Sequence, residues 1–398
     1  MYDVGALDGI RVLDLTRVLA GPYCTMMLAD MGAEVIKIEV PKIGDDSRQF
    51  GPFVNKESSY YMNLNRNKKG VTLNLKSPAG KSIFLKLIQN ADVVVENYRP
   101  GTMEKLDLGY DVLKKINPAI IYGCVSGFGH YGPYKDRAGY DIIGQAMGGL
   151  MSTTGWPNGE PTRTGTAMAD VLAGLSLTIA LLAALRHRTE SGLGQKVDIS
   201  LVDSVVSSLE IINQIYLTEG RIPERIGNRY ESVYPYDSFR VRDGSIVIGC
   251  GNDKLWQKLC NVIKESDLAL DERYDKNIKR VKKHKEVKEI VENWSKSLTI
   301  DSAVDILLQA GIPAAPINTI DRLVKDEHIA NAREMFVEIE HPLAGKLHLT
   351  GSHLKFSDTR TAIKTPSPLL GQHNEEVFCG LAGISLTELS KLEEDGVV

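Results

Sequence analysis

Short apolar runs alternate with helical patterns along the first 220 residues. Six of the runs predict strands, at residues 10–15, 34–39, 71–75, 92–96, 120–126 and 196–200. The other segments predict helices at residues 23–31, 78–90, 140–151, 171–185 and 202–217. The strands of a parallel sheet are buried on both faces, and these runs are correspondingly apolar on both sides. The alternation therefore predicts an α/β fold with a doubly wound, Rossmann-like parallel sheet.

The pattern changes after residue 217. Residues 218–236 are polar and irregular, which is typical of a linker. A hairpin is predicted at 238–241 and 245–249, followed by helices at 254–263, 284–297 and 301–310. Strands at 335–340 and 346–350 and a helix at 374–380 are predicted in the tail. We therefore expect a large domain over residues 1–220, a smaller α+β domain over 230–320, and a C-terminal segment, 321–398, that returns to the large domain.

Asp170 stands where a segment rich in small residues meets the apolar helix predicted at 171–185. Aspartate is a preferred helix cap, which would be a sufficient structural role for this residue. A carboxylate at a helix start can also serve as a nucleophile, and neighbouring glycines let a substrate approach it. The local pattern leaves both roles open. The apolar run is shorter than the about 20 residues that span a bilayer, so we expect a buried core helix.

The composition is that of an ordinary soluble protein, with 43% hydrophobic and 25% charged residues. A net charge of −4 argues against binding to nucleic acid or an anionic membrane. The five cysteines are scattered and form no C-x-x-C pair, so we expect neither disulfides nor a metal site. Because the N-terminal residues show no secretion signal, we expect a cytoplasmic protein.

Ligands of a doubly wound sheet bind beyond the carboxyl ends of its strands. The segments predicted there carry Arg17, Lys76, Asn97 and Arg99, a polar and basic rim that suits a phosphate-bearing ligand. His130, in a glycine-rich loop, is either an exposed residue or an acid–base group. The first loop lacks G-x-G-x-x-G, which disfavours a nicotinamide dehydrogenase. G-x-S-x-G, H-E-x-x-H and P-loop motifs are also missing, which disfavours the corresponding hydrolases.

Eight stretches match one known family in the family's own order. They are residues 7–16 (LDGIRVLDLT), 20–22 (AGP), 32–39 (GAEVIKIE), 65–70 (NRNKKG), 95–101 (VENYRPG), 127–133 (GFGHYGP), 170–174 (D-x-x-x-G) and 369–373 (LLGQH). By these motifs the chain resembles the class III CoA-transferases of the CaiB/BaiF type. Formyl-CoA transferase and carnitine CoA-transferase belong to this family, and α-methylacyl-CoA racemases are related to it. Each motif is short, but together they span nearly the whole chain.

The resemblance implies that Asp170 is the nucleophile of a CoA-transferase. Such an enzyme moves CoA from a donor acyl-CoA to an acceptor carboxylic acid through covalent aspartyl intermediates. It also implies an interlocked homodimer, acyl-CoA as a substrate, and no permanently bound cofactor. The chain lacks the glycine-run loop of formyl-CoA transferase, which argues against oxalate and formyl-CoA as substrates. The implied CoA-binding residues are Leu19, Ala20, Leu73, Asn74, Leu75, Lys76, Asn97, Tyr98, Arg99, Lys105, Arg137 and Tyr140.

Two alternatives remain open. A racemase of the same superfamily pairs its aspartate with the histidine of an Ala-Gly-His-Asp motif, whereas this chain has Tyr140 in the sequence AGYD. Tyrosine, whose reference pKa is about 10, is a poor general base near neutral pH. A non-catalytic CoA-binding protein would tolerate the loss of Asp170, which this chain retains. Both observations favour the transferase.

Overall fold

The computed structural model describes residues 4–398. The first three residues, on which the expectation about a secretion signal partly rests, lie outside the described part. The chain divides into two compact units. The first unit contains the chain up to Leu150 together with Arg163–Glu219 and Asp326–Val398, and the second contains Met151–Thr162 and Gly220–Lys325.

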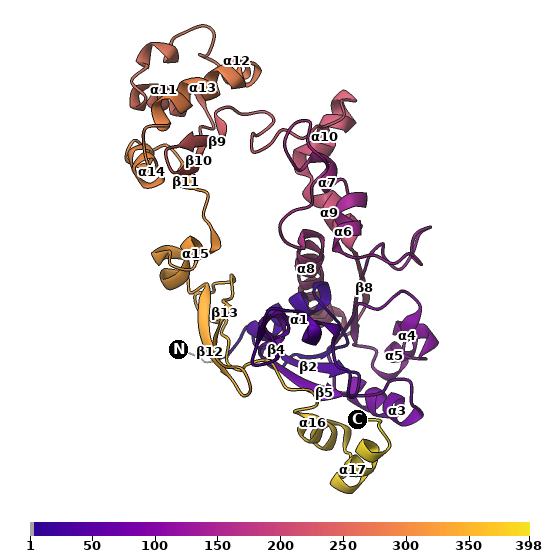
Figure 1. Ribbon diagram of the computed structural model, residues 1–398. Helices are drawn as coiled ribbons and strands as arrows, with labels where there is room; N and C mark the ends of the chain where they lie inside the picture. Colours follow the sequence, from indigo (N-terminus) through magenta and orange to yellow (C-terminus); the bar gives the residue numbers. More distant parts are fainter. Residues whose placement is uncertain (1–3) are drawn as a thin grey trace. The chain divides into compact units, whose positions relative to one another are not determined.

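Six parallel strands form the central sheet of the first unit, in the order β5-β2-β1-β6-β7-β8 (Figure 1). Numbered along the chain, these strands follow the order 3-2-1-4-5-6 that is usual for doubly wound nucleotide-binding folds. The predicted fold class is confirmed. The order reverses between β1 and β6, which opens a crevice at their carboxyl ends. The strands are β1 (Arg11–Asp14), β2 (Glu34–Glu39), β5 (Lys68–Thr72), β6 (Val93–Glu96), β7 (Ile121–Ser126) and β8 (Lys196–Ser200).

One prediction for this sheet is displaced: β5 lies at Lys68–Thr72 rather than at 71–75. The chain turns away from the sheet after Leu73, since the Asn74 N–H donates a hydrogen bond of 2.7 Å to the carbonyl of Val397. Apolar character at Leu73 and Leu75 therefore reflects burial in the core beyond the strand.

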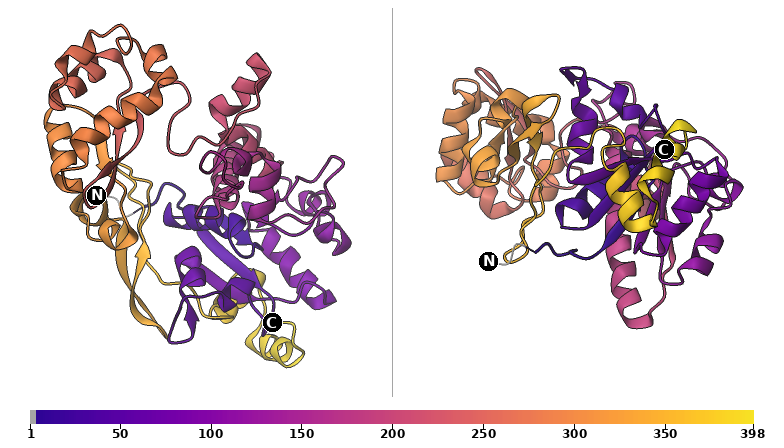
Figure 2. Two further views of the ribbon diagram at one scale, coloured as in Figure 1. Left: turned by 45° about the horizontal axis from the view of Figure 1, so that its top comes forward. Right: turned by 90° about the horizontal axis from the view of Figure 1, so that it is seen from below.

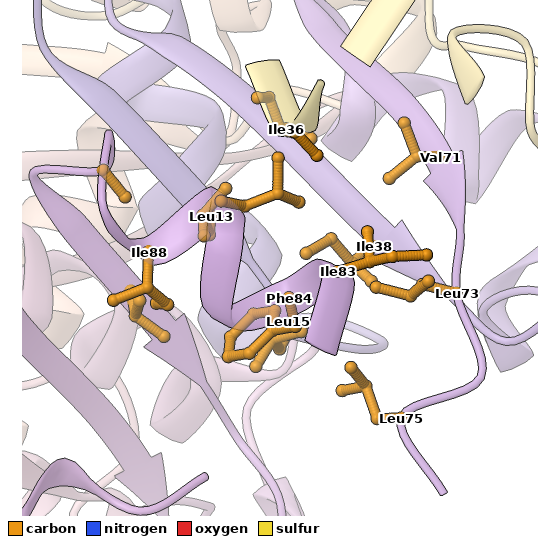
Figure 3. Close-up of a cluster of buried hydrophobic side chains, with 14 of the residues drawn as sticks. Leu13, Leu15, Ile36, Ile38, Val71, Leu73, Leu75, Ile83, Phe84 and Ile88 are labelled. Atoms are coloured by element: carbon orange, nitrogen blue, oxygen red, sulfur yellow. The ribbon is translucent and has the colours of Figure 1, made fainter. Parts of the chain in front are cut away.

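Helices cover both faces of the sheet, and successive strand residues point to opposite faces. Val12 and Val35 pack in the core beneath α1 (Ala20–Asp30) and α8 (Met168–Ser191). Leu13 and Ile36 pack in the opposite core with α3 (Pro78–Ile88), where Figure 3 shows Ile83 and Phe84 beside Leu15 and Ile38. Burial on both sides explains why the strands are continuous apolar runs. That second core also receives α4 (Thr102–Lys105), α5 (Tyr110–Ile116), α16 (Asn374–Ala382) and α17 (Leu386–Glu394).

The C-terminal helices protect the β5 edge of the sheet. Helix α16 contacts β5 and α3, and α17 packs on α16; Figures 1 and 2 show the pair beside this edge in several views. The His373 N–H donates to the carbonyl of Gly70, and the Thr72 N–H donates to the side chain of Asn374. Backbone groups that an open edge would expose are thus paired within the chain.

Two predicted helices are interrupted in the structure. The helix predicted at 202–217 forms α9 (Leu201–Ser208) and α10 (Glu210–Glu219), because Glu210 has a φ of 32°. The helix predicted at 140–151 forms α6 (Asp141–Met147) and α7 (Leu150–Thr153), with Gly149 between them at a φ of 89°. Neither break has a proline, so the apolar pattern runs through both.

Helix α8 is long and apolar enough, by length and composition alone, to cross a membrane. Its contacts with α1, β7, β8 and α9 place it instead in the core of the first unit. Only 39% of an apolar 18-residue stretch of α8 is buried, and Ile179 is 68% exposed. The expectation of a buried core helix therefore holds for one face of α8, and the other face is uncovered in this single chain.

The long loop expected at residues 41–65 is more structured than its irregular sequence suggests. It contains a short helical turn at Asp46–Gln49, the hairpin β3 (Phe53–Val54) and β4 (Glu57–Ser58), and α2 (Ser59–Asn65). Ser58 caps α2 by accepting the Tyr61 N–H at 3.1 Å. Elements of two to seven residues have too few positions for a periodic pattern, as is also true of α4 and α5.

The second unit has its own sheet and its own core. Strands β9 (Tyr236–Val241) and β10 (Gly244–Gly249) form the predicted hairpin. The segment interpreted as a proline-rich connection contains β11 (Ala314–Pro316), which extends this sheet beside β10. The helices of this unit are α11 (Asp253–Val262), α12 (Asn277–Lys282), α13 (His284–Ser295), α14 (Ile300–Gln309) and α15 (Ile320–Leu323). The hairpin β12 (Phe336–His341) and β13 (Gly345–Thr350) belongs to the first unit.

Candidate active site

A cavity of about 370 Å³ lies at the point where the strand order reverses. Its walls include the segment after β1, from Arg17 to Ala20, and the segment after β6, from Asn97 to Pro100. The Asn97 side chain joins these walls, since it accepts the Arg17 N–H at 2.8 Å and donates to the Arg17 carbonyl at 2.7 Å. Further walls come from the end of β7, the segment before α6, and the start of α8.

The structure brings eight of the thirteen site residues implied by the family resemblance to this cavity. They are Leu19, Ala20, Asn97, Tyr98, Arg99, Arg137, Tyr140 and Asp170. The other five, which do not line it, are Leu73, Asn74, Leu75, Lys76 and Lys105. The side chains of Leu73 and Leu75 are instead part of the core packed against α3.

Three arginines give the cavity a cationic rim. Arg17 pairs with Asp46, which also borders the cavity. Arg99 and Arg137 are exposed, and neither has an ion pair within residues 4–398. The Arg137 guanidinium lies over the ring of Tyr134, 3.6 Å from its centroid, in a cation–π contact. Guanidinium groups bind phosphate oxygens in two-point contacts, so this rim suits a phosphate-bearing ligand.

Asp170 is the third residue of α8 and does not cap it. The cap position is Ala167, which has no side-chain hydrogen bond to offer. The capping carboxylate belongs to Asp141, the first residue of α6, whose Oδ1 accepts the Ala169 N–H at 2.9 Å. The local interpretation of Asp170 as an N-cap is therefore wrong, because a carboxylate 29 residues earlier in the chain occupies that role. The Asp170 carboxylate lines the cavity instead.

Gln145, which is fully buried on α6, fixes the segment that leads into α8. Its Nε2 donates to Asp141 Oδ2 at 2.8 Å, and its Oε1 accepts the Thr164 N–H at 2.9 Å. Both Asp141 oxygens are thus engaged and the start of α8 is anchored. The local sequence around Asp170 contains no sign of these partners. The run AGYD does place an acidic residue at 141, and this signal could have identified it.

Burial raises the pKa of Asp170 to about 7, and the negative charge of Asp141 adds to the shift. The carboxylate is therefore a better nucleophile than an ordinary aspartate but is only about half ionised at neutral pH. Burial, together with the charges of Asp170, Asp45 and Asp141, raises the pKa of Tyr60 to about 12. Tyr60, on α2, therefore keeps its phenolic proton at neutral pH. It also lies close enough to Asp170 for the charge of that carboxylate to affect its pKa.

The N–H groups of the first turn of α8 are mostly engaged. The Met168 N–H donates to the Thr166 carbonyl at 2.9 Å, and the Ala169 N–H donates to Asp141. These two N–H groups are therefore not available to stabilise an oxyanion. Within the described chain, the Asp170 N–H is the one left for that purpose.

Gly127 and Gly139 pack against each other at the cavity wall. A Cβ on Gly139 would lie 2.5 Å from the Gly127 Cα, so no side chain fits. This contact holds the Arg137–Tyr140 segment over the end of β7.

We expect Gly139→Ala to lower the free energy of unfolding by about 1–3 kcal/mol, the usual cost of forced overpacking. Thermal and urea unfolding would measure the change. Gly165→Ala is the control, because a Cβ there meets nothing within 4 Å and Gly165 has no positive φ. Equal stability of the two variants would contradict the close packing of Gly139.

A basic cavity at the reversal point of the sheet, with a partly buried carboxylate on its wall, defines a protein that brings a phosphate-bearing ligand to a nucleophile. The sequence profile of CoA-transferase family III matches residues 7–374. The chain belongs to this family and is a CoA-transferase. The resemblance noted from the sequence motifs, and the class of enzyme it implied, are confirmed.

Characterised relatives align over almost the full chain. Succinyl-CoA:glutarate CoA-transferase from Homo sapiens is 38% identical and covers 100% of this chain and 91% of its own length. Succinyl-CoA:mesaconate CoA-transferase from Haloarcula marismortui is 38% identical over 98% of this chain and 100% of its own. The crystal structure of a CAIB/BAIF family protein from Brucella suis superposes with a TM-score of 0.84 at 36% identity, covering 95% of this chain and 100% of that one.

Proposed function

We propose that this enzyme transfers CoA between dicarboxylic acids, with Asp170 as the covalent nucleophile. The observation that carries the proposal is the position of Asp170: a carboxylate with a pKa raised by burial, on the wall of a cavity with an arginine rim. The two relatives described above are named for succinyl-CoA with glutarate or mesaconate, which supports a five-carbon dicarboxylic acceptor. Acyl-CoA enters as a substrate, and no resident cofactor takes part.

The reaction proceeds in four balanced steps. An Asp170 oxygen attacks the thioester carbon of the donor, and the C–S bond breaks to release CoA thiolate and leave a mixed anhydride. The thiolate then attacks the Asp170 carbonyl carbon, which releases the donor acid and leaves an aspartyl thioester. The acceptor carboxylate displaces the thiolate to form a second anhydride. Finally the thiolate attacks the acceptor's carbonyl carbon and Asp170 is restored as a carboxylate.

An exchange assay tests the proposed function. The protein is mixed with succinyl-CoA and a panel of mono- and dicarboxylic acids, and acyl-CoA products are identified by mass spectrometry. We expect new thioesters from wild type with dicarboxylic acids and none from Asp170→Asn. A racemase would instead introduce deuterium from heavy water into an α-methylacyl-CoA, which would overturn the transferase proposal and the view of Tyr140 as a poor base. Absence of both reactions in a protein that binds CoA would favour a non-catalytic role.

Oxygen labelling distinguishes the covalent route from direct attack of the acceptor on the donor thioester. In the four steps above, one oxygen of the acceptor remains on Asp170, and the released donor acid takes its oxygen from Asp170. A single turnover with excess enzyme and ¹⁸O-labelled acceptor should therefore label the peptide that contains Asp170 and leave the donor acid unlabelled. Label in the donor acid after one turnover would rule out the aspartyl route.

The charge of Asp141 should set the pH range in which Asp170 is ionised. Asp141→Asn keeps an oxygen that can accept the Ala169 N–H but removes a negative charge that raises the pKa of Asp170. We expect kcat/KM of wild type to rise with pH through about 7, and this limb to shift to lower pH in the variant by up to about one unit. Measurements of kcat/KM for both proteins from pH 5 to 9 would show this shift. An unshifted limb would mean that another group controls the reaction.

We also propose that the active form is a cytoplasmic homodimer. The uncovered face of α8 and the exposed apolar side chains Ile142, Ile143, Met147, Tyr216 and Leu217 support an interface between two chains. All five cysteines are free, which supports a reducing compartment. Sedimentation velocity should give twice the chain mass, and cell fractionation should recover the enzyme with soluble proteins. A monomer at micromolar concentration would contradict the homodimer. Recovery of the enzyme with membranes would contradict the cytoplasmic location.

A further inference from the structure

A buried polar cluster lies beneath the cavity, on the sheet face opposite α8. The strand register places Glu96 of β6 beside Cys124 of β7, and Cys124 beside Asp198 of β8. His130, from the loop after β7, completes the cluster with its Nε2 3.7 Å from Glu96 Oε1. The His130 side chain is only 9% exposed, and its Nε2 is buried without a hydrogen-bond partner. The Asp170 chemistry uses none of these groups.

Distance alone would allow a metal ion here, since ligand atoms of Glu96, Cys124 and His130 lie within 4.8 Å of one another. The second nitrogen of His130 argues against it. Metal-bound histidines usually donate that N–H to a carboxylate or carbonyl. Here Lys196 Nζ lies 3.1 Å from His130 Nδ1, and an ammonium group can only donate. Nδ1 is therefore the acceptor, and Nε2 carries the proton and cannot ligate a metal.

The same contact makes His130 a hydrogen-bond donor aimed at Glu96. Burial lowers the pKa of His130, and the positive charge of Lys196 lowers it further, so the ring stays neutral with its proton on Nε2. The His130 backbone is held by Asp198, whose Oδ2 accepts its N–H at 2.8 Å. An ionised Glu96 is the acceptor that this Nε2–H lacks, and a small approach from 3.7 Å makes a charge-assisted hydrogen bond.

Glu96 also reaches the opposite wall of the cavity. Its Oε2 accepts the Tyr98 N–H at 2.7 Å, and the adjoining Asn97 is clamped to the Arg17 backbone. His130, in turn, lies in the loop that leads from β7 to the wall segment containing Arg137 and Tyr140. One carboxylate thus stands between the two loops that carry most of the cationic rim.

We propose that ionised Glu96 is a positioning residue that bridges the Tyr98 N–H and the His130 Nε2–H, and so holds both loops in the arrangement that binds CoA. Protonation of Glu96 removes the charge that attracts His130 and loosens the bridge. Affinity for CoA therefore falls as the pH is lowered. The inference rests on the proposed binding of acyl-CoA in this cavity and adds a pH-dependent control of affinity that is separate from the Asp170 chemistry.

The groups that face Glu96 place its titration in the physiological range. Burial raises its pKa to about 7, against the lowering effect of the hydrogen bonds from the Tyr98 N–H and the Tyr122 hydroxyl. From α4, the negative charge of Glu104 raises this pKa further, and from β8 the Lys196 ammonium lowers it. Cys124 stays a neutral thiol, since burial and the Glu96 charge raise its pKa well above the ordinary value.

Calorimetric titration with CoA tests the inference without requiring turnover. We expect the Kd of Glu96→Gln to exceed that of wild type by about fivefold or more at pH 8, and by less than about twofold at pH 6. The two Kd values are compared at the same pH, because titration of the CoA phosphates affects binding to both proteins equally and cancels in the ratio. His130→Phe should behave in the same way. The double variant should bind no more weakly than either single variant, since both remove one bridge.

Glu190→Gln is the matched control, because Glu190 is an exposed glutamate on α8 paired with Arg186. It should bind CoA like wild type at both pH values. The inference would be overturned if the Kd of Glu96→Gln divided by that of wild type were the same at pH 8 and pH 6. Additive effects of Glu96→Gln and His130→Phe in the double variant would also overturn it. Circular dichroism shows whether each variant is folded. A wild type that binds CoA but exchanges no acid would refute the proposed function and leave this test valid.

Discussion

Replacing Asp170 with Asn should reduce kcat/KM for CoA exchange by at least about 10³-fold, because the Asp170 carboxylate forms the covalent intermediates of the proposed reaction. Asn has the same shape and keeps the packing at the start of α8, but its amide oxygen cannot displace a thiolate. Binding of CoA should survive, since the arginine rim is untouched. Exchange kinetics and calorimetric titration with CoA would measure the two effects separately.

The same substitution should stabilise the protein at alkaline pH. The folded-state pKa of Asp170, about 7, lies above the ordinary value of 3.8, so wild type loses stability as the pH rises from 3.8 to about 7, and the loss is complete above that pH. Asn avoids this loss, and we expect its unfolding temperature to exceed that of wild type by a few degrees at pH 8 and to match it at pH 4.

Asp111→Asn is the control for both measurements, because Asp111 is an exposed acidic residue in the first turn of α5. It should change neither exchange activity nor the pH dependence of stability. Substantial exchange by Asp170→Asn would mean that another group is the nucleophile. Lower stability at pH 8 would mean that the carboxylate is held by partners that favour its charge.

Replacing Lys37 with Met should lower the free energy of unfolding by about 3–5 kcal/mol, the usual cost of breaking a buried ion pair. Lys37 Nζ lies 2.8 Å from Asp45 Oδ2, and both side chains are fully buried. Burial alone would lower the pKa of Lys37, but the charges of Asp45 and Asp14 outweigh it and raise the pKa. Without the ammonium group two carboxylates remain buried with less compensation. Urea unfolding at pH 7 would measure the loss.

This ion pair also supports the cavity. Lys37 Nζ donates to the Thr16 carbonyl at 2.8 Å, and Asp45 Oδ1 accepts the Val18 N–H at 3.1 Å, so the pair holds the segment after β1. Lys37→Met should therefore weaken CoA binding as well. Lys86→Met, at an exposed position of α3, should change stability by no more than about 0.5 kcal/mol. A similarly small effect at Lys37 would contradict the structural role of the pair.

The periodic pattern of the sequence was sufficient for the elements with long uniform runs. Strands β2 and β8 lie at the predicted residues, and Ser77 caps α3 as its position before Pro78 indicates. Such elements are determined locally, because a run buried on both faces or a cap acts within a few residues. The fold class followed from their alternation, and the family followed from short motifs that occur in order.

Contacts between distant residues could not be predicted in this way. Asp170 is free to line the cavity because Asp141, 29 residues earlier, caps α8 in its place. The cluster around Glu96 exists only because the strand register aligns β6, β7 and β8. The strand order that sets β1 beside β6, and with it the cavity, is likewise a long-range pairing. The sequence by itself determined which segments are strands and helices and which carboxylate is the candidate nucleophile. The tertiary structure decided its environment and pKa, because burial and neighbouring charge arise from residues far apart in the chain.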